Sequence, residues 1–187
     1  MYYSQEELNK IGFKSLGKNV KVSTKTSIYG AERISFGDNV RIDDFCFLSA
    51  GAGGITLGNN IHISTYSSIA GQGEVIMEDF SGLSSRVSIY SSSDDYSGAA
   101  LTNPTIPAEF SNVIHGKVHL KKHVIVGAGS VILPGVLLEI GVAVGALSLV
   151  TKSFEEFSII SGNPAKFFKK RKTNLIELEW KYLKSLT

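Results

Sequence analysis

The chain has 187 residues, of which 43% are hydrophobic and 19% are charged. These values exclude a disordered tail and a coiled coil, and they are typical of one domain with a sizeable core. The net charge is only +2, and the cations between residues 166 and 172 form one local basic cluster. We therefore expect no nucleic-acid partner, because nucleic-acid-binding domains carry a broad basic face.

The single cysteine excludes a disulfide framework and a cysteine-rich metal site. No apolar run approaches the roughly 20 residues that a membrane-spanning helix needs. The first residues show no basic stretch followed by an apolar one, so no signal peptide is expected. The sequence therefore predicts a cytoplasmic protein without membrane insertion.

Residues 1–15 are predicted to form a helical cap. Ser4 followed three residues later by Glu7 is a capping box, which marks the start of a helix. Leu8, Ile11 and Phe13 follow at positions that can cover the open end of a repeat domain. Repeat domains need such covers, because their terminal repeats otherwise expose apolar surface.

Residues 16–154 show a six-residue rhythm of aliphatic positions. The blocks LGKNV, FGDNV and LGNNI recur at steps of about 20 residues, and a later run places one aliphatic residue at every sixth position (Leu120, Val126, Ile132, Leu138, Val144, Val150). This period fits neither an amphipathic helix nor an alternating strand. It predicts an all-β, parallel β-helix of about six coils, with glycine and asparagine at corners of positive φ. A β-sandwich with glycine turns is the alternative, and the spacing does not give the hand of the helix.

The rhythm breaks between residues 91 and 117, where a long excursion loop is predicted. Long irregular loops inside regular domains are usually functional. The loop leaves the coil and returns to the same side, so its two feet should lie close together. This brings the acid pair Asp94 and Asp95 near His115.

Residues 155–187 are predicted to form a turn and a C-terminal helix that starts near Asn174. Ile176, Trp180 and Leu183 share one face of that helix and should pack against the coil.

Several segments resemble the hexapeptide-repeat acyltransferases: VIVGAGSVILPGV, GVAVGALSLVTKS and SGNPAKFFKKR. Together with RIDDFC, SIYSSSDDYSG and LTNPTIP they are most similar to sugar O-acetyltransferases of the galactoside and maltose type, often found with polysaccharide or O-antigen synthesis. The resemblance covers nearly the whole chain. It implies a left-handed β-helix, a homotrimer with active sites between subunits, acetyl-CoA as donor substrate, no metal, and a histidine as general base.

His115 is the favoured general base, because it stands at a foot of the loop beside the acid pair. In the maltose-type enzymes the histidine falls where this chain has Asp94 and Asp95. The acids could orient His115, or one of them could be the base with a raised pKa, or both could merely cap the first turn of the loop. The remaining histidines are expected to be exposed or outward-facing, with His62 stacked on Arg41, and His119 and His123 in regular coil.

The donor is expected to lie along the coils that carry small residues, where a ligand can approach the backbone. Lysines and an arginine beyond these coils would meet the nucleotide phosphates of CoA. The cofactor-binding candidates are Gly127, Ala128, Gly129, Ser130, Gly145, Ala146, Lys152, Lys166, Lys169, Lys170 and Arg171. The other interpretation of the small residues is that they only satisfy corner geometry.

The favoured function is therefore acetyl transfer from acetyl-CoA to a sugar hydroxyl by direct attack with a general base. The alternative is N-acetylation of a nucleotide-linked amino sugar, which we rank second because such enzymes often carry an added nucleotide-binding domain. A zinc enzyme of the γ-carbonic anhydrase kind would need His115, His119 and His123 to converge, which their spacing opposes. A structural β-helix without activity is the third class, and the loop argues against it.

Overall fold

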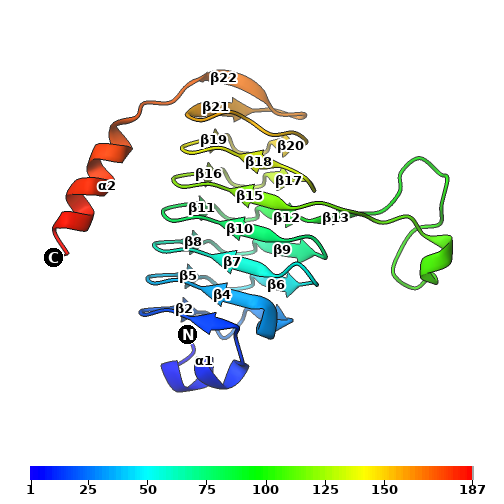
Figure 1. Ribbon diagram of the computed structural model, residues 1–187, viewed down its shortest axis with the longest axis horizontal. Coiled ribbons are helices and arrows are strands. Elements are labelled where there is room, and N and C mark those ends of the chain that lie inside the picture. The colour runs from blue at the N-terminus through cyan, green and yellow to red at the C-terminus, as the bar shows by residue number, and fades with distance from the viewer. Residues whose placement is uncertain (187) are drawn as a thin grey trace.

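The computed structural model describes residues 1–186, and it shows a solenoid whose coils each contribute one short strand to three parallel sheets (Figure 1). The residue Thr187, at the end of the expected C-terminal segment, lies outside the described part. The predicted all-β, left-handed parallel β-helix with two terminal helices is confirmed. The first sheet contains β1 (Ser15–Leu16), β4 (Ile34–Phe36), β7 (Ile55–Leu57), β10 (Val75–Met77), β15 (Val118–Leu120) and β18 (Leu137–Leu138).

The second sheet is the longest and the third closes each coil. The second contains β2 (Lys21–Val22), β5 (Arg41–Ile42), β8 (His62–Ile63), β11 (Gly82–Leu83), β16 (Ile125–Val126), β19 (Ala143–Val144), β21 (Ser158–Ser161) and β22 (Lys166–Lys170). The third contains β3 (Ser27–Tyr29), β6 (Phe47–Ala50), β9 (Ser68–Gly71), β12 (Ser88–Tyr90), β17 (Val131–Ile132) and β20 (Leu149–Val150).

The six-residue rhythm becomes columns of aliphatic side chains inside the solenoid. Parallel pairing in the second sheet places identical repeat positions side by side, and each member of the resulting column is buried (Val22, Ile42, Ile63, Leu83, Val126, Val144, Ile160). Each coil thus covers the apolar face of the one before it, which is how a solenoid builds a continuous core.

The corners divide into two kinds. Between the first and second sheets, asparagines adopt positive φ as predicted in the first coils (Asn19, Asn39, Asn60), whereas Phe80 and His123 hold this conformation further along. Between the second and third sheets, the same left-handed conformation is held by Phe45, Tyr66, Arg86 and Leu147, with φ of 57–61°. The expectation of glycine or asparagine was wrong at these four positions, where a side chain in this conformation costs on the order of 1–2 kcal/mol. It holds at Gly129, which takes the same corner with φ of 70°.

The N-terminal helix α1 (Gln5–Ile11) has the predicted capping box, in which Ser4 accepts a bond from the Glu7 amide and the Glu7 carboxylate accepts one from the Ser4 amide. Leu8 is buried, and Ile11 and Phe13 pack against the core. The helix therefore covers the first coil as expected.

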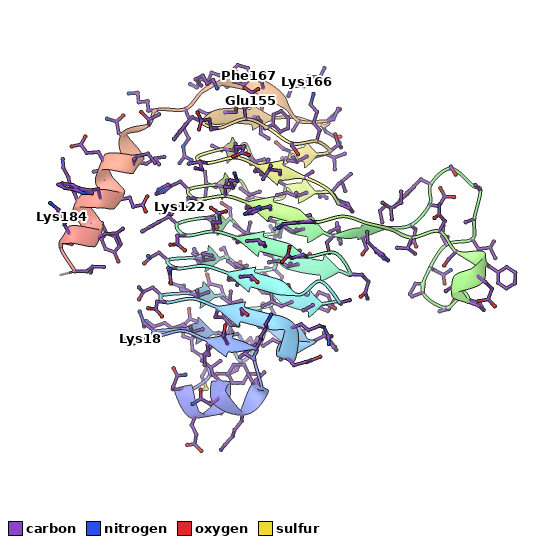
Figure 2. The ribbon with its side chains drawn as sticks, in the orientation of Figure 1. Lys18, Lys122, Glu155, Lys166, Phe167 and Lys184 are labelled. Atoms are coloured by element: carbon purple, nitrogen blue, oxygen red, sulfur yellow. The ribbon has the colours of Figure 1, made fainter. Side chains whose placement is uncertain are left out.

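The C-terminal end of the solenoid carries an additional strand that the sequence did not reveal. β22 turns back antiparallel to β21 across the end of the stack, with Lys166 and Phe167 on its outer edge (Figure 2). The chain then leads to α2 (Asn174–Lys184), which stands beside the coils (Figure 1).

Helix α2 contacts the coils through a face that differs from the predicted one. Glu179 bonds to Lys122 and His123, and Leu175, Leu178 and Tyr182 line a small apolar pocket beside the coil residue Phe80. Ile176, Trp180 and Leu183 are 44%, 56% and 43% exposed and make none of these contacts, so the predicted face is not the one that holds α2 on the coils. The helical periodicity alone could not reveal the contact of Glu179, because a carboxylate is not an expected packing residue.

Among residues 1–186, no helix has the length and apolar character that crossing a membrane requires.

Candidate active site

The excursion loop begins and ends in a short antiparallel ribbon on the side of the solenoid. β13 (Ser92–Ser93) pairs with β14 (Ile114–His115), so Ser92 lies directly opposite His115. The feet of the loop are therefore adjacent, as predicted. Lys117 also forms an ion pair with Glu74, at 3.0 Å, which ties the returning foot to the preceding coil.

His115 is exposed and is oriented by a serine, not by an acid. Its Nδ1 lies 2.8 Å from the Ser92 hydroxyl, and that hydroxyl oxygen also accepts a bond of 2.7 Å from the main-chain N–H of Gln72. The structure records no contact between His115 and either acid of the pair among the described residues. The sequence missed Ser92 because serine is common throughout this segment and carries no positional signal.

Asp95 caps the first turn of the loop. Its carboxylate accepts bonds from the amide and hydroxyl of Ser97 and from the amide of Ala100, at 2.8–3.0 Å. These bonds lower the pKa of Asp95, with Ser97 as the main cause. This geometry agrees with the interpretation that Asp95 caps the turn. A general base at this position would need a raised pKa, and the pKa of Asp95 is lowered.

Asp94 differs from its neighbour. It is half-buried at the start of the loop, and its carboxylate has no hydrogen-bond or ion-pair partner among residues 1–186. A carboxylate with free acceptor capacity beside the His115 ribbon is chemically able to take a proton. The two acids, which the sequence treats alike, are therefore in different environments.

The remaining histidines serve the fold. His62 lies next to Arg41 in the second sheet, as predicted. His119 bonds to Glu78 at 2.7 Å, and His123 is 9% exposed and bonds to Glu179 at 2.6 Å. The expectation that His119 and His123 are exposed was wrong, because both lie under carboxylates from other elements. Residues 1–186 contain no group of histidine, cysteine and acidic side chains that could hold a metal ion.

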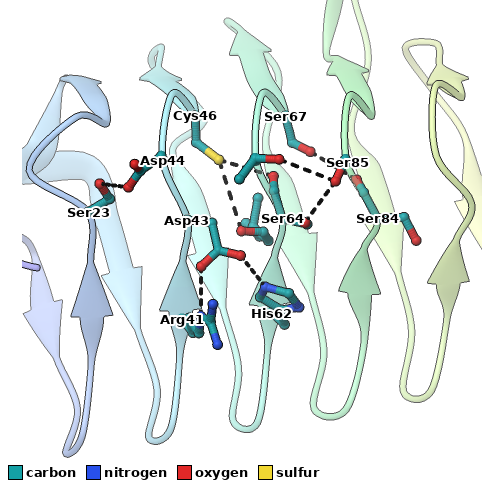
Figure 3. A network of polar contacts seen from close by, with 12 residues as sticks. Ser23, Arg41, Asp43, Asp44, Cys46, His62, Ser64, Ser67, Ser84 and Ser85 are labelled. Atoms are coloured by element: carbon teal, nitrogen blue, oxygen red, sulfur yellow. Dashed lines mark hydrogen bonds and ion pairs between the residues drawn. The ribbon is translucent and has the colours of Figure 1, made fainter. Parts of the chain in front are cut away.

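Asp43 lies beside the second sheet, where Figure 3 shows it bonded to Arg41 and His62. It is 8% exposed and accepts bonds from Arg41 and His62, both at 2.7 Å, and from the Tyr2 hydroxyl at 3.1 Å. Burial alone would raise its pKa, but the three bonds outweigh burial and lower it. The network links Tyr2, near the N-terminus, to the coils.

The small residues predicted to bind the donor lie together at the corner between the second and third sheets. A Cβ on Gly127 would lie 2.5 Å from the Ala146 nitrogen, and one on Gly145 would lie 2.8 Å from the Ser161 Cβ, so stacking of the coils already requires both glycines. Ala128 and Ala146 are exposed at this corner. Gly129 has φ of 70°. Donor binding by these residues stays a prediction.

Ser130 and Arg171 have structural partners that account for them. Ser130 is fully buried and donates to the Gly145 carbonyl at 3.0 Å. Arg171 donates to the carbonyls of His123 and Gly141, at 2.8 and 3.0 Å, and burial lowers its pKa. These contacts leave little of either side chain for a ligand.

The predicted lysines are better placed for phosphates. Lys166, Lys169 and Lys170 lie along the exposed strand β22, and Lys152 is exposed on the coil end. Lys170 reaches the Glu156 carbonyl at 3.2 Å, Lys152 lies over the Phe154 ring, and Lys169 lies over the Phe168 ring. Phosphate binding by these lysines also stays a prediction.

An aromatic ladder runs along the corner between the second and third sheets. Phe45 and Tyr66 stack at 5.0 Å, with Lys25 over one end and Arg86 over the other. Both aromatic rings are about half exposed. Sequence reasoning missed the ladder because aromatic residues are not expected in left-handed corners.

No protein-family model matches the chain. A dTDP-4-amino-4,6-dideoxy-D-glucose acyltransferase from Escherichia coli is 51% identical over 178 residues, which are 95% of this chain and 93% of that protein. AntD, an N-acyltransferase from Bacillus cereus solved with dTDP and 3-hydroxybutyryl-CoA, superposes with a TM-score of 0.95 at 51% identity, covering 99% of this chain and 97% of that chain.

The chain belongs to the hexapeptide-repeat acyltransferases. A more distant member of this group, the putative lipopolysaccharide O-acetyltransferase WbbJ of Escherichia coli K12, is 30% identical over 77% of this chain and 72% of its own length. The chain is thus an acyltransferase, as the sequence predicts. The narrower likeness to galactoside and maltose O-acetyltransferases is not what these relatives show, because the most similar of them is named for an amino sugar.

Proposed function

We propose that this enzyme transfers an acyl group from a CoA thioester to the amino group of a dTDP-linked 4-amino-4,6-dideoxy sugar. The proposal rests on one observation: this chain is 51% identical to a relative named for that acceptor, over nearly the whole length of both proteins. This replaces O-acetylation, the favoured sequence-based function, with the N-acyl alternative. A second relative was solved with dTDP and a CoA thioester, which supports the same pair of substrates.

The argument that ranked N-acylation second does not hold. It assumed that a nucleotide-linked acceptor needs an added nucleotide-binding domain. The relative named for such an acceptor matches this chain over 93% of its own length, so it has little room for an added domain. A β-helix of this size is therefore sufficient for this class of acceptor.

The chemistry requires little from the protein beyond positioning and proton transfer. The amine nitrogen attacks the thioester carbonyl, and a C–N bond forms while a tetrahedral oxyanion develops. A base takes one proton from the nitrogen and returns it to the sulfur as the C–S bond breaks, so that CoA leaves as the free thiol. His115 is our first candidate for the base, since its ring is exposed and held by Ser92. Asp94 is the second, and solved variants of AntD include ones with an aspartate changed to alanine or asparagine.

We further propose that the active enzyme is a homotrimer and that the sites lie between copies. The loop projects far from the solenoid (Figure 1) and leaves apolar side chains uncovered, among them Tyr96 at 93% and Phe110 at 57% exposure. Apolar residues also line the outer corner of the coils, where Phe45, Tyr66 and Leu147 are exposed. Exposed apolar surface of this kind is typical of protein interfaces.

The proposed function is tested by incubating the purified enzyme with acetyl-CoA or 3-hydroxybutyryl-CoA and dTDP-4-amino-4,6-dideoxyglucose. We expect a product with an amide-linked acyl group by mass spectrometry and one equivalent of free thiol. A matched acceptor with a hydroxyl in place of the amine should give no product. Transfer to the hydroxyl compound with none to the amine would overturn the proposal.

A further inference from the structure

A cavity of about 650 Å³ opens beside the loop, at the corner between the third and first sheets. Tyr29, Arg33, Ser49 and Gln72 line it, together with main chain of three successive coils. The 3₁₀ turn η1 (Ala31–Arg33) lies at this corner and carries Arg33. The cavity is linked to the candidate base through its lining residue Gln72, whose main-chain N–H donates to the Ser92 hydroxyl, which in turn bonds to His115.

The side chains of this cavity are donors, and none of its lining residues is acidic. Gln72 has its orientation fixed, since its carbonyl oxygen accepts a bond of 2.9 Å from the Ala52 amide. Its NH₂ group therefore remains to donate, and it has no partner among residues 1–186. The Ser49 hydroxyl likewise has no partner in the described part of the chain.

Arg33 adds a guanidinium, whose charge is partly balanced by its ion pair with Glu32. Its guanidinium donates to the carbonyls of Ala50 and Gly51, at 2.9–3.1 Å, and pairs with Glu32 on its outer side. A guanidinium has five N–H groups, so this arrangement leaves some of them unused while holding the group rigid. Rigid donors around one cation are suited to oxygen-rich anions such as a diphosphate.

An aromatic ring completes the cavity. Tyr29 is 60% exposed at its rim, and its ring lies 5.6 Å from that of Phe47. A flat, uncovered ring beside an anion-binding wall can stack on a nucleobase, which is worth about 1–3 kcal/mol in single-stranded nucleic-acid complexes.

We infer that this cavity binds the nucleoside diphosphate part of the acceptor. Arg33, Gln72 and Ser49 would donate to the diphosphate, and Tyr29 would stack on the nucleobase. The inference rests on the proposed function and assigns a place to its acceptor. The sugar amine would then extend along the corner toward Ser92 and His115.

The sharpest test is Gln72→Glu, with Gln5→Glu as its matched control. Glutamate keeps the acceptor for the Ala52 amide, so the corner stays intact, but it replaces the NH₂ donor by a charged oxygen. The chain has its second glutamine at Gln5, exposed on α1, where the same change adds the same charge far from the cavity. Calorimetry with dTDP should show at least about a tenfold loss of affinity in Gln72→Glu, from one lost charge-assisted bond and the added repulsion, and none in Gln5→Glu.

The variant Tyr29→Ala distinguishes binding of the nucleobase from binding of the diphosphate. We expect it to weaken dTDP binding several-fold and to leave inorganic pyrophosphate binding unchanged, whereas Gln72→Glu should weaken both. Affinity for CoA should not change in any of these variants. Equal dTDP affinity in Gln72→Glu and wild type would overturn the inference.

The outcome is separable from that of the proposed function. If the wild-type enzyme acylates the dTDP-linked amine but Gln72→Glu keeps an unchanged KM for it, the assignment of the cavity fails and the function stands. If the wild-type enzyme does not acylate this acceptor but binds dTDP through these residues, the function fails and the cavity remains a nucleotide site.

Discussion

His115 and Asp94 are two proton acceptors near the loop ribbon, and their surroundings suggest different roles. The His115 ring is held at one nitrogen by Ser92, which leaves the other directed away from that bond. The Asp94 carboxylate has no partner among the described residues, whereas Asp95 is committed to the turn. Under the proposed function, the base is whichever of His115 and Asp94 meets the amine of the acceptor.

We expect His115→Ala to lower kcat by roughly 10²–10⁴ while the affinity for CoA is unchanged, because proton transfer is lost but the donor site is not touched. Steady-state kinetics and calorimetry measure the two quantities. Asp95→Asn serves as the comparison, and its kcat should fall much less. Near-full turnover of His115→Ala, combined with loss of activity in Asp94→Asn, would assign the base to Asp94 instead.

Asp43 gives a prediction on stability and pH. Its folded-state pKa is lowered, so it binds its proton less tightly in the folded than in the unfolded chain. Such a carboxylate stabilises the fold above its unfolded pKa of about 3.9, and the stabilisation is lost as the pH falls through the lower folded value.

Asp43→Asn should therefore lower the free energy of unfolding by about 1–3 kcal/mol at pH 7, because His62, Arg41 and Tyr2 lose a charged acceptor. Denaturant unfolding at pH 7 and near pH 3 measures the effect, which should shrink at the lower pH. A difference that stays constant between the two pH values would show that the charge of Asp43 is not what matters.

Helix α2 is the element whose orientation the sequence least reveals. Its predicted apolar face is exposed, and the helix is held by Glu179, whose carboxylate lies between Lys122 and His123. Burial would raise the pKa of Glu179, but those two bonds outweigh burial and lower it. The helix is therefore held on the coils by the polar contacts of Glu179, beside an apolar pocket.

Glu179→Ala should release the helix without unfolding the coils. We expect faster amide exchange over residues 174–184 by mass spectrometry and a nearly unchanged Tm, because the core columns do not include α2. Glu177→Ala is the control, since Glu177 is exposed and pairs only with Lys181 four residues along the same helix. Protection of the helix that is equal in both variants would contradict the role of Glu179.

The repeat rhythm predicted the strands well, for a physical reason that also explains where it failed. Inward aliphatics every six residues are required by the stacking of coils, so they are visible in the sequence. The corners depend on outward contacts: Phe45 and Tyr66 take a left-handed conformation while they stack on each other. Such contacts, like the bond from His115 to Ser92, link residues about 20 positions apart and leave no periodic signal.

At the scale of the whole molecule, large apolar side chains are exposed on the outer corner of the coils, as the proposed trimer requires. Leu147 is 78% exposed on the outer corner, in line with the aromatic ladder. We expect the native particle to have three times the mass of the 20.2 kDa chain.

Leu147→Arg should reduce both the mass and the activity of the enzyme, because a charge in an apolar contact opposes association and the proposed trimer has its sites between copies. Light scattering after gel filtration measures the mass. Leu186→Arg is the control, since Leu186 is similarly exposed but lies beyond the end of α2. A particle of one-chain mass in the wild type would refute the trimer.

The excursion loop interrupts the chain but not the stack. Strand β10, before the loop, pairs in continuous parallel register with β15, after it: Val75 lies opposite Val118, Ile76 opposite His119 and Met77 opposite Leu120. The solenoid therefore closes over the insertion as if consecutive coils had simply continued. Such an insertion is free to change in length and composition during evolution without loosening the scaffold. If the loop shapes the acceptor site as we propose, acceptor preference can diversify in this part of the chain while the coils stay unchanged, and exchanging loops between relatives would alter selectivity.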